Sequence, residues 1–289
     1  MANPNAAFAR WLTNDSMSNY HALELEVRRR LSNGLQFQAD YTFSKALTDA
    51  RDALGNNQSD LVSFRTLRNK SLDYARSNQD QTHRFVANAI YDMPFGSGKK
   101  YLSHSNGVID RIVGGWSLGG IVVWQSRPPF YITSNRTSFN NFNAGNNPAV
   151  LAGISFAEFK NNLGLFKTPT GVYFVNPALL NITTNPTTGA FATSTLKSGL
   201  MAAPAPGTFG DFPINSLVGP AYFNIDASLV KRFAITETTR LEIKTTAINV
   251  LNHPNFVYGG NTFDSTSFGR ITSTSGNARI VHFTMKLIW

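Results

Sequence analysis

The chain has 289 residues, of which 42% are hydrophobic and only 15% charged, and its formal net charge is +9. It contains no cysteine, which excludes a disulfide framework and a thiolate metal site. The basic residues are scattered, and no basic helix or RNA-binding signature accompanies them, so we expect no nucleic-acid partner. No apolar run reaches the roughly 18 residues of a membrane-spanning helix, but this does not exclude a membrane β-barrel, whose strands are short and half apolar.

The first predicted elements are two strands joined by a short turn. Residues 20–31, YHALELEVRRRL, alternate between apolar and polar side chains, and residues 35–44 do the same. The turn between them contains Asn33-Gly34, which is typical of a tight hairpin. A helix would spread the charged residues around its circumference, whereas a strand places them on one face. The pattern therefore predicts an amphipathic β-hairpin.

Five further segments alternate with the same period, and the connections between segments alternate in length. The further segments are residues 83–93, 116–127, 222–233, 240–251 and 278–289. The shorter connections are 32–34, 94–113 and 234–239, and the longer ones are 45–82, 128–221 and 252–278. A transmembrane barrel carries short periplasmic turns on one rim and long extracellular loops on the other. The sequence therefore predicts an all-β, antiparallel transmembrane β-barrel with its C-terminus in the periplasm.

The two faces of these strands predict two environments. Polar side chains would line a wet lumen, whereas apolar side chains would face lipid. The candidate lumen-lining residues are Glu24, Glu26, Arg28, Gln38, Asp40, Arg84, Asp92, Asp226 and Arg232. Aromatic residues near strand ends are expected to form membrane girdles, and these are Tyr41, Phe43, Tyr91, Trp116, Trp124 and Trp289. Arg29 also faces outward, beside the hairpin turn, where it can reach the polar interface.

Five stretches of the chain resemble the C-terminal part of TonB-dependent outer-membrane transporters, of the Oar-like type abundant in acidobacteria. They are SNYHALELEVRRRLSNGLQFQADYTFSKAL (18–47), DQTHRFVANAIYDMPFGSGKKY (80–101), GWSLGGIVVWQSRPPF (115–130), GPAYFNIDASLVKRFAITETTRLEIKTTAINVLNHPNF (219–256) and FGRITSTSGNARIVHFTMKLIW (268–289). They cover about half of the chain in the expected order, whereas the loop 131–218 matches only loosely. The closing stretch is the most specific.

The resemblance implies a role for the last strand. In such proteins the outer-membrane insertion machinery reads a terminal aromatic residue preceded by apolar residues at every second position. Here those residues would be Val281, Phe283, Met285, Leu287 and Trp289. Phenylalanine is the commoner last residue in the family, and Trp289 keeps the aromatic character that suits a membrane interface.

The resemblance also implies that residues 1–289 are a fragment of the bacterial outer-membrane protein. The family has a signal peptide, an N-terminal β-sandwich, a plug domain, a TonB-contacting segment and a barrel of about 22 strands. The seven predicted strands would be the C-terminal portion of such a barrel, with a long extracellular loop at about 128–220 that is either folded or partly disordered. The N-terminus, MANPNAAFARW, lacks the pattern of a signal peptide.

The implied function of the intact protein is active uptake of a solute across the outer membrane. The implied partners are outer-membrane lipid, the barrel-assembly machinery, the missing N-terminal part of the barrel with its plug, and the TonB complex through that part. An alternative is a structural or adhesive surface protein that binds a partner through its long loops, and a weaker one is a soluble β-sandwich binding module.

No motif indicates an enzyme, a cofactor or a metal site. FGSGKK (95–100) departs from a phosphate-binding loop, because the first glycine of that pattern would fall at Met93. No two histidines have a ligand spacing, and no serine lies in a nucleophile elbow. Asp49, Asp52 and Asp60 lie in a polar loop that could bind calcium, but their spacing is not that of an EF-hand. We therefore expect no catalytic residue and no cofactor.

Overall fold

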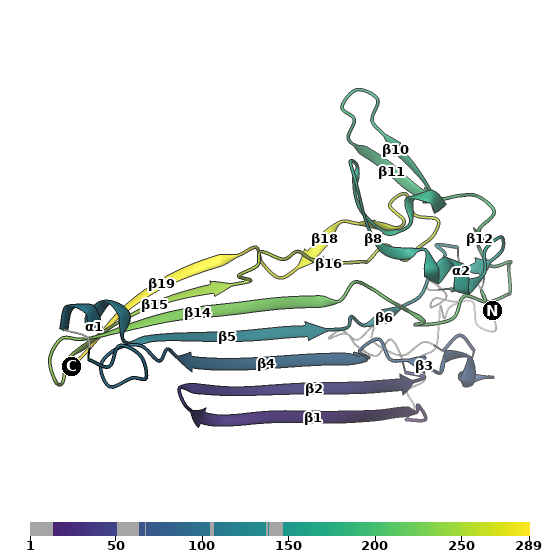
Figure 1. Cartoon of the computed structure of the whole chain (residues 1–289). Helices are drawn as coiled ribbons and strands as arrows, with labels where there is room; N and C mark the ends of the chain where they lie inside the picture. The colour runs from purple at the N-terminus through teal and green to yellow at the C-terminus, as the bar shows by residue number, and fades with distance from the viewer. Residues whose placement is uncertain (1–13, 51–63, 67, 105–106, 137, 139–146) are drawn as a thin grey trace, which may run out of the picture.

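The structure is a computed structural model that describes residues 14–50, 64–66, 68–104, 107–136, 138 and 147–289 (Figure 1). Its main feature is a sheet built around long strands. These are β1 (Ser18–Ser32), β2 (Leu35–Thr48), β4 (His83–Asp92), β5 (Trp116–Gln125), β14 (Tyr222–Ala234), β15 (Arg240–Ile248) and β19 (Ile280–Ile288). They pair in chain order, and each pair is antiparallel. The predicted all-β, antiparallel fold is confirmed.

The predicted strand boundaries differ from the observed ones most at β2, which continues to Thr48 beyond its predicted end at residue 44, and at β15. Strand β15 ends at Ile248, so Leu251, which the alternation placed on its apolar face, lies in the turn that follows. Asn249 and Asn252 both have positive φ values, 50° and 51°, which ends the extended conformation. The short strand β3 (Ala75–Arg76) pairs with β2 beyond the last residue of β2 that pairs with β4.

The connections are sorted between the two ends of the sheet as the sequence predicts. Figure 1 shows the turn between β1 and β2, the helix α1 (Gly107–Val113) and the C-terminus at one end, and the long connections at the other. β1 and β19 both run from the long-connection end to the short-turn end. Within the described part of the chain, each has a neighbouring strand on one side only. The sheet is therefore an open portion of a barrel wall.

The turn between β1 and β2 is tight. Asn33 has a φ of 52° and Gly34 a φ of 79°, which is the backbone of a two-residue hairpin turn that twists with its strands. The Asp92 amide donates to the Gly34 carbonyl at 2.7 Å, so the turn is bonded to the end of β4. A Cβ atom on Gly34 would lie 2.6 Å from the Asp92 carbonyl oxygen. Both the φ angle and this contact require glycine.

We therefore expect Gly34→Ala to destabilise the sheet by about 1–3 kcal/mol, because the substitution adds backbone strain and a steric clash. The measurement is urea unfolding of the chain refolded in lipid vesicles. Gly98→Ala is the matched control, since Gly98 has a φ of 71° but a Cβ atom added there would meet no other atom within 4 Å. An equal loss in the two variants would show that the Asp92 contact contributes nothing.

The long connections fold into a second body at one end of the sheet, which we call the loop lobe (the described residues of 126–221 and 249–279). Its first elements are β6 (Pro129–Phe130), β7 (Val150–Leu151), α2 (Phe156–Asn161), β8 (Leu163–Thr168), β9 (Gly171–Val175), η3 (Pro177–Leu179) and β10 (Leu180–Thr184). The others are β11 (Phe191–Leu196), β12 (Met201–Ala202), β13 (Leu217–Val218), β16 (Asn255–Val257), β17 (Arg270–Ile271) and β18 (Ser273–Ser275). The connection between β2 and β4 adds the short helix η1 (Lys70–Asp73).

Two long connections build this lobe together. β17, from the connection before β19, pairs with β9, from the connection between β5 and β14. Ser194 Oγ donates to the Phe268 carbonyl at 2.7 Å, again across the two connections. The sequence left the loop at about 128–220 as either folded or partly disordered, and its described part is folded.

The hydrophobic core lies in the loop lobe and not in the sheet. Every fully buried apolar side chain of the described residues belongs to the lobe, and none belongs to a long strand. Phe212 is 1% exposed and makes edge-to-face contacts with Phe156 and Phe159, at centroid distances of 5.7 and 5.9 Å. Ser155 caps the helix that carries both partners by accepting from the Glu158 amide. The lobe thus has its own packed interior, whereas the apolar side chains of the sheet remain at the surface.

Candidate functional site

The two faces of the sheet are the candidate functional surfaces, and the strand register defines them. Directly paired residues of an antiparallel sheet project to the same face. One such row crosses five strands through Leu25, Tyr41, Phe85, Trp124 and Phe223. This row is wholly apolar or aromatic, and we call its side of the sheet the apolar face.

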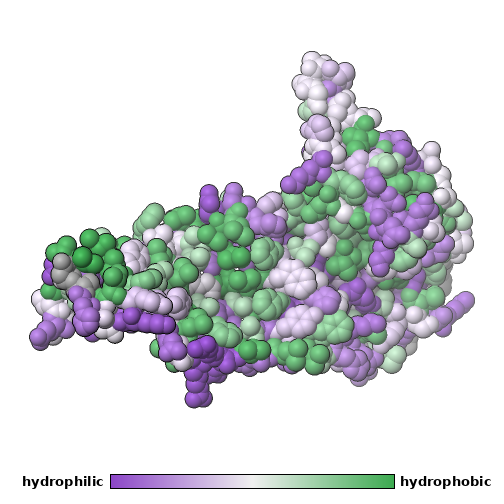
Figure 2. Space-filling view, in the orientation of Figure 1, coloured by the Kyte–Doolittle hydropathy of each residue, from purple (hydrophilic) through white to green (hydrophobic). Residues whose placement is uncertain are grey.

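Large side chains of the apolar face are exposed although they are hydrophobic. Leu25 is 53% exposed, Val27 59% and Phe283 78%. Figure 2 shows hydrophobic residues at the surface along the sheet and over α1. An extended, exposed apolar surface of this kind is typical of a face that a membrane or a partner protein covers.

Aromatic side chains gather at both ends of the apolar face. Trp116 and Trp124 stand at the two ends of β5, eight residues apart. At about 3.3 Å per residue this separation is roughly 26 Å, close to the height of about 25 Å of the apolar band of outer-membrane barrels. The register places all the predicted girdle residues within the strands on this face, and Trp289 follows β19 with 86% of its surface exposed.

His83 belongs to the aromatic group at the loop-lobe end, although its residue type gave no reason to include it. Its Nδ1 atom lies 2.8 Å from the hydroxyl of Tyr41. Its ring centroid lies 5.2 Å from that of Phe43 and 6.0 Å from that of Trp124. His83 is therefore a hydrogen-bonded member of an aromatic cluster.

The opposite face of the sheet carries the polar residues. One row of paired residues crosses it through Glu24, Thr42, Arg84, Gln125 and Tyr222. Because side chains alternate along each strand, the same face receives every candidate lumen-lining residue: Glu24, Glu26, Arg28, Gln38, Asp40, Arg84, Asp92, Asp226 and Arg232. We call this side the polar face.

Two of these candidates meet in a network near the short-turn end. Ser117 Oγ donates to the Asp92 carboxylate, and Arg232 Nη1 donates to Ser117 Oγ at 3.2 Å. Arg232 Nε also donates to Glu242 Oε2 at 2.9 Å. The network links four neighbouring strands, β4, β5, β14 and β15. Ser117 and Glu242 were not among the candidates, although the alternation had placed both on the polar side.

The other candidates do not join this network, although Gln38 and Asp40 contact each other on β2. Gln38 Nε2 lies 3.3 Å from both carboxylate oxygens of Asp40. Asp226 accepts from the side chain of Asn224 and from the Asn249 amide, both at 2.8 Å, so it fixes the turn after β15. The candidates on β1 are exposed, as is the whole of that strand. The polar face is thus a lining of dispersed charges and not a single ligand site.

The polar face also contains apolar residues that the sequence-based prediction did not include. Val86 of β4 pairs with Val123 of β5, and Ile121 pairs with Asn88. Ile90 is 54% exposed and Ile121 48%. These four residues, Val86, Ile90, Ile121 and Val123, form a patch in the middle of the polar face, which we call the inner apolar patch.

Arg127 stands at the loop-lobe end of the polar face, just past β5. Its Cζ atom lies 5.2 Å from the centroid of the Tyr222 ring. Its Nε and Nη2 atoms are buried and have no hydrogen-bond partner among the described residues. Burial lowers the pKa of the Arg127 guanidinium from its ordinary value, since desolvation disfavours the charged form. A partly buried guanidinium with two buried donors that lack a partner among the described residues is a candidate contact for an anionic or carbonyl group.

The residues proposed as an assembly signal lie on the apolar face of the last strand. Met285 pairs with Ile243, and Leu287 with Leu241. The exposed fractions of the five residues range from 45% for Val281 to 86% for Trp289; the set is Val281, Phe283, Met285, Leu287 and Trp289. On its other side β19 has no neighbouring strand in the part of the chain that the structure describes. Both the side chains and the strand edge are accessible.

The acidic residues considered for calcium do not form a site that the structure shows. Asp49 is 3% exposed and accepts from the Met17 amide at 2.8 Å, whereas Asp52 and Asp60 lie outside the described residues. No group of three potential metal ligands occurs among the residues that the structure describes. In the same residues, no helix is long and apolar enough to span a membrane.

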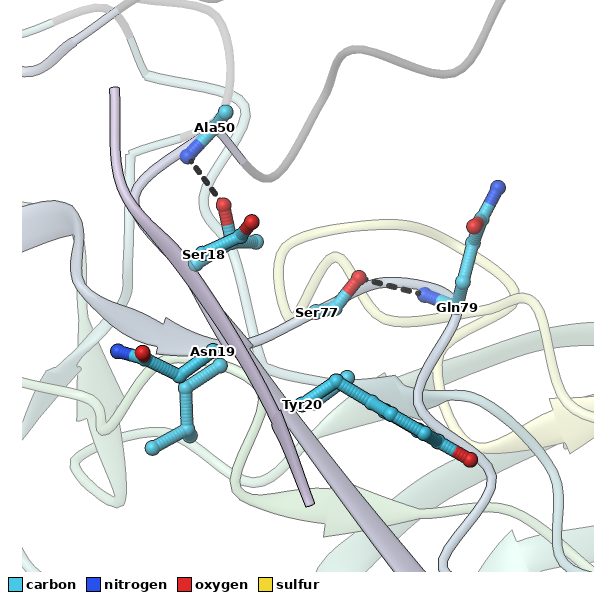
Figure 3. A pocket seen from close by; sticks show the side chains of 9 residues that line it. Ser18, Asn19, Tyr20, Ala50, Ser77 and Gln79 are labelled. Atoms are coloured by element: carbon cyan, nitrogen blue, oxygen red, sulfur yellow. Dashed lines mark hydrogen bonds between the residues drawn. The ribbon is translucent and has the colours of Figure 1, made fainter. Parts of the chain in front are cut away.

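A shallow pocket at the loop-lobe end of β1 and β2 has a small polar lining (Figure 3). Two of its hydroxyl groups are engaged within the protein, because Thr48 Oγ1 accepts from the Ala50 amide and Ser77 Oγ from the Gln79 amide, at 3.0 and 3.2 Å. No acidic or basic side chain lines it. The pocket gives no reason to assign a ligand.

Comparison with known proteins agrees with the geometry of the two faces. A family model described as "Outer membrane beta barrel domain" matches residues 2–282. Searches of curated proteins and of solved structures gave no match. An apolar face with aromatic ends, a polar opposite face and antiparallel strands are the features of such a domain. Because the match covers nearly the whole chain, the protein belongs to the outer membrane beta barrel domain family and is a protein of the outer membrane.

Proposed function

We propose that the chain is the C-terminal part of the barrel of a TonB-dependent transporter of the Oar-like type, which takes up a solute actively across the outer membrane. The long strands contribute part of the wall of a barrel of about 22 strands. A plug domain, the remaining strands and a segment that contacts TonB complete the transporter. The chain itself catalyses no reaction, and without these parts it transports nothing.

The inner apolar patch is the observation that favours a transporter with a plug. In a water-filled pore, Ile90 and Ile121 would leave about half of their surfaces in water. Covering such side chains stabilises a protein by about 25 cal/mol per Å² of apolar surface. A domain that fills the lumen would cover the patch and leave the surrounding charges at its hydrated margin.

The open sheet supports the presence of further strands. Backbone groups at an unpaired sheet edge are not satisfied in hydrocarbon, where each costs several kcal/mol. β1 and β19 both have such an edge among the described residues. Additional strands on both sides would satisfy these groups. The barrel-assembly machinery is the partner expected to use the β19 edge and its exposed apolar side chains during insertion.

The loop lobe supports capture of a solute outside the cell. It is a packed body at the end of the sheet that carries the long connections, and Arg127, at its start just past β5, has two donors without a partner among the described residues. We assign this end to the extracellular side and the α1 end to the periplasm, following the rule that outer-membrane barrels have long loops outside.

A second candidate, an adhesive surface protein, is favoured by one feature of the lobe. The hairpin of β10 and β11 projects away from the rest of the lobe (Figure 1), and most residues between 183 and 190 are exposed. A projecting polar hairpin is suited to contact a partner on another surface. In this alternative the barrel anchors the lobe, and nothing is imported.

Deletion of the gene separates the two candidates. The transporter proposal expects loss of saturable uptake of one class of solute, and the same loss when the gene for TonB is deleted or the proton gradient is collapsed. Uptake that stays unchanged, together with reduced attachment of the cells to surfaces, would favour the adhesive protein.

The DNA preceding the codon for Met1 provides an independent test. We expect in-frame sequence that encodes further barrel strands, a plug and a signal peptide. An antibody against the loop lobe should then detect a polypeptide much larger than 31.8 kDa in the outer membrane. A promoter directly before Met1 and a band at the size of this chain would contradict the proposal.

A further inference from the structure

The connection between β4 and β5, which the sequence predicts to be one of the shorter periplasmic turns, is partly helical. It contains α1, whose Val108 and Ile112 lie one helical turn apart and are 69% and 65% exposed. Figure 2 shows the hydrophobic cluster over this helix at the short-turn end of the sheet. Tyr101 and Leu102, from the preceding turn, are 49% and 53% exposed. We call residues 95–104 and 107–113 the basal foot.

Hydrogen bonds hold α1 against the apolar face of the sheet. Trp116 Nε1 donates to the Ile112 carbonyl at 2.9 Å. Lys231 Nζ donates to the same carbonyl at 3.1 Å and also to the carbonyl of Gly114. Trp116 and Lys231 are register partners, and Lys231 also pairs with Ile243 of the apolar face. The C-terminal end of α1 therefore lies outside the barrel wall and not in the lumen.

Lys231 explains why the helix is needed at this position. A lysine on the lipid side of a barrel is costly unless its charge is compensated. Lys231 is only 5% exposed, and its ammonium lies 5.1 and 4.9 Å from the ring centroids of Trp116 and Phe233. The carbonyls at the end of α1 carry partial negative charge and accept hydrogen bonds from the Lys231 ammonium. The helix thus allows a cation to lie on a face that is otherwise apolar.

The exposed part of the basal foot combines apolar and basic side chains. Lys99, Lys100 and Arg111 are exposed around it. The acid within the helix, Asp110, accepts from the Ser97 amide and so joins α1 to the turn before it. The apolar surface of Val108 and Ile112 continues from the apolar face through Trp116. This arrangement of apolar contact and cations is typical of a segment that lies in the interface of an anionic membrane.

We propose that the basal foot binds anionic phospholipid headgroups in the leaflet at the short-turn end of the barrel. Val108 and Ile112 enter the boundary between headgroups and acyl chains, while Lys99, Lys100 and Arg111 attract phosphate groups. Lipid is the occupant because the surface is continuous with the face that an outer-membrane barrel gives to lipid. The proposal depends on membership of the barrel family and not on transport.

Depth-dependent quenching tests where the foot lies. The chain has no cysteine, so Ile112→Cys can be labelled with a fluorophore without removing other thiols. Refolded in vesicles, this label should be quenched by brominated lipid and protected from aqueous iodide. Phe37→Cys on the apolar face is the positive control, and Thr188→Cys in the exposed β10–β11 turn is the aqueous control.

Several outcomes would overturn the proposal. One is iodide access at position 112 equal to that at Thr188→Cys. Another is energy transfer between labelled copies that vanishes on dilution with unlabelled chain, because it would mean that a second copy covers the foot. Failure of lipid to quench the label at Phe37→Cys would remove the membrane orientation on which the proposal is built.

The charge requirement is tested with lipids that differ in headgroup. Brominated phosphatidylglycerol should quench the label at position 112 at least about five-fold more effectively than brominated phosphatidylcholine, because each basic residue near an anionic surface contributes roughly 1 kcal/mol, which is about a factor of five. The double variant Lys99→Gln and Lys100→Gln should lower this ratio toward one. Lys197→Gln, which removes an exposed charge from the loop lobe, should leave it unchanged. A ratio near one in the parent chain would refute the preference for anionic lipid.

Discussion

The substitution Val122→Arg should keep the sheet out of a lipid bilayer, whereas Val123→Arg should not. Val122 lies on the apolar face, where it pairs with Ala87 and Ile225. Val123, the next residue of the same strand, lies on the polar face and pairs with Val86 and Asn224. An arginine near the bilayer midplane costs about 2–4 kcal/mol, which is roughly a 30- to 900-fold change in the insertion equilibrium.

The measurement is the fraction of refolded chain that resists trypsin after insertion into vesicles. Val123→Arg carries the same charge on the same strand, so it controls for propensity and for net charge. We expect its effect to stay below about 1 kcal/mol, because water solvates the polar face of the isolated chain. Equal losses in the two variants would contradict the assignment of the faces.

Phe212→Ala should open the loop lobe while leaving the strands folded. The side chain is 1% exposed and packs against two other phenylalanines, so its removal leaves a cavity. Such a truncation costs about 3–5 kcal/mol. Hydrogen exchange should accelerate by a factor of at least about 100 in β9, α2 and their neighbours, because a lobe with that loss opens far more often.

Phe283→Ala is the matched control for this prediction. It removes the same group from the exposed apolar face, where 78% of the side chain is accessible. Exchange in the loop lobe should therefore be unchanged in this variant. Slow exchange in the lobe of Phe212→Ala, or equally fast exchange in both variants, would show that the lobe has no cooperative core of its own.

The long strands could be predicted from the sequence because their two faces meet two different environments. Each side chain from Leu35 to Phe43 alternates between lipid-facing and polar sides, and period two leaves no comparable solution for a helix. The loop lengths then predict that strands consecutive in the chain are neighbours in the sheet, since two antiparallel neighbours need only a turn between them. The lumen-lining candidates reached the polar face for the same reason, because a face follows from position along a strand.

The interactions between distant segments could not be predicted in this way. Lys231 lies on the apolar face by simple alternation, but its partners are carbonyls of a helix more than a hundred residues earlier. Proline, asparagine and glycine dominate the long connections, and their short strands pair through contacts such as β17 with β9. The inner apolar patch was not predicted because each strand contributes only one or two apolar residues to a face that is otherwise polar. Ile90 of β4 and Ile121 of β5 are such residues.

Because β1 and β19 point in the same direction, no ring built only from copies of this chain can be antiparallel throughout. Each junction between the last strand of one copy and the first strand of the next would be parallel. Inverting alternate copies would restore the pairing, but it would place their loop lobes on opposite sides of the membrane. Antiparallel closure therefore requires an odd number of strands of different sequence, and those that flank β1 and β19 must run toward the loop lobe.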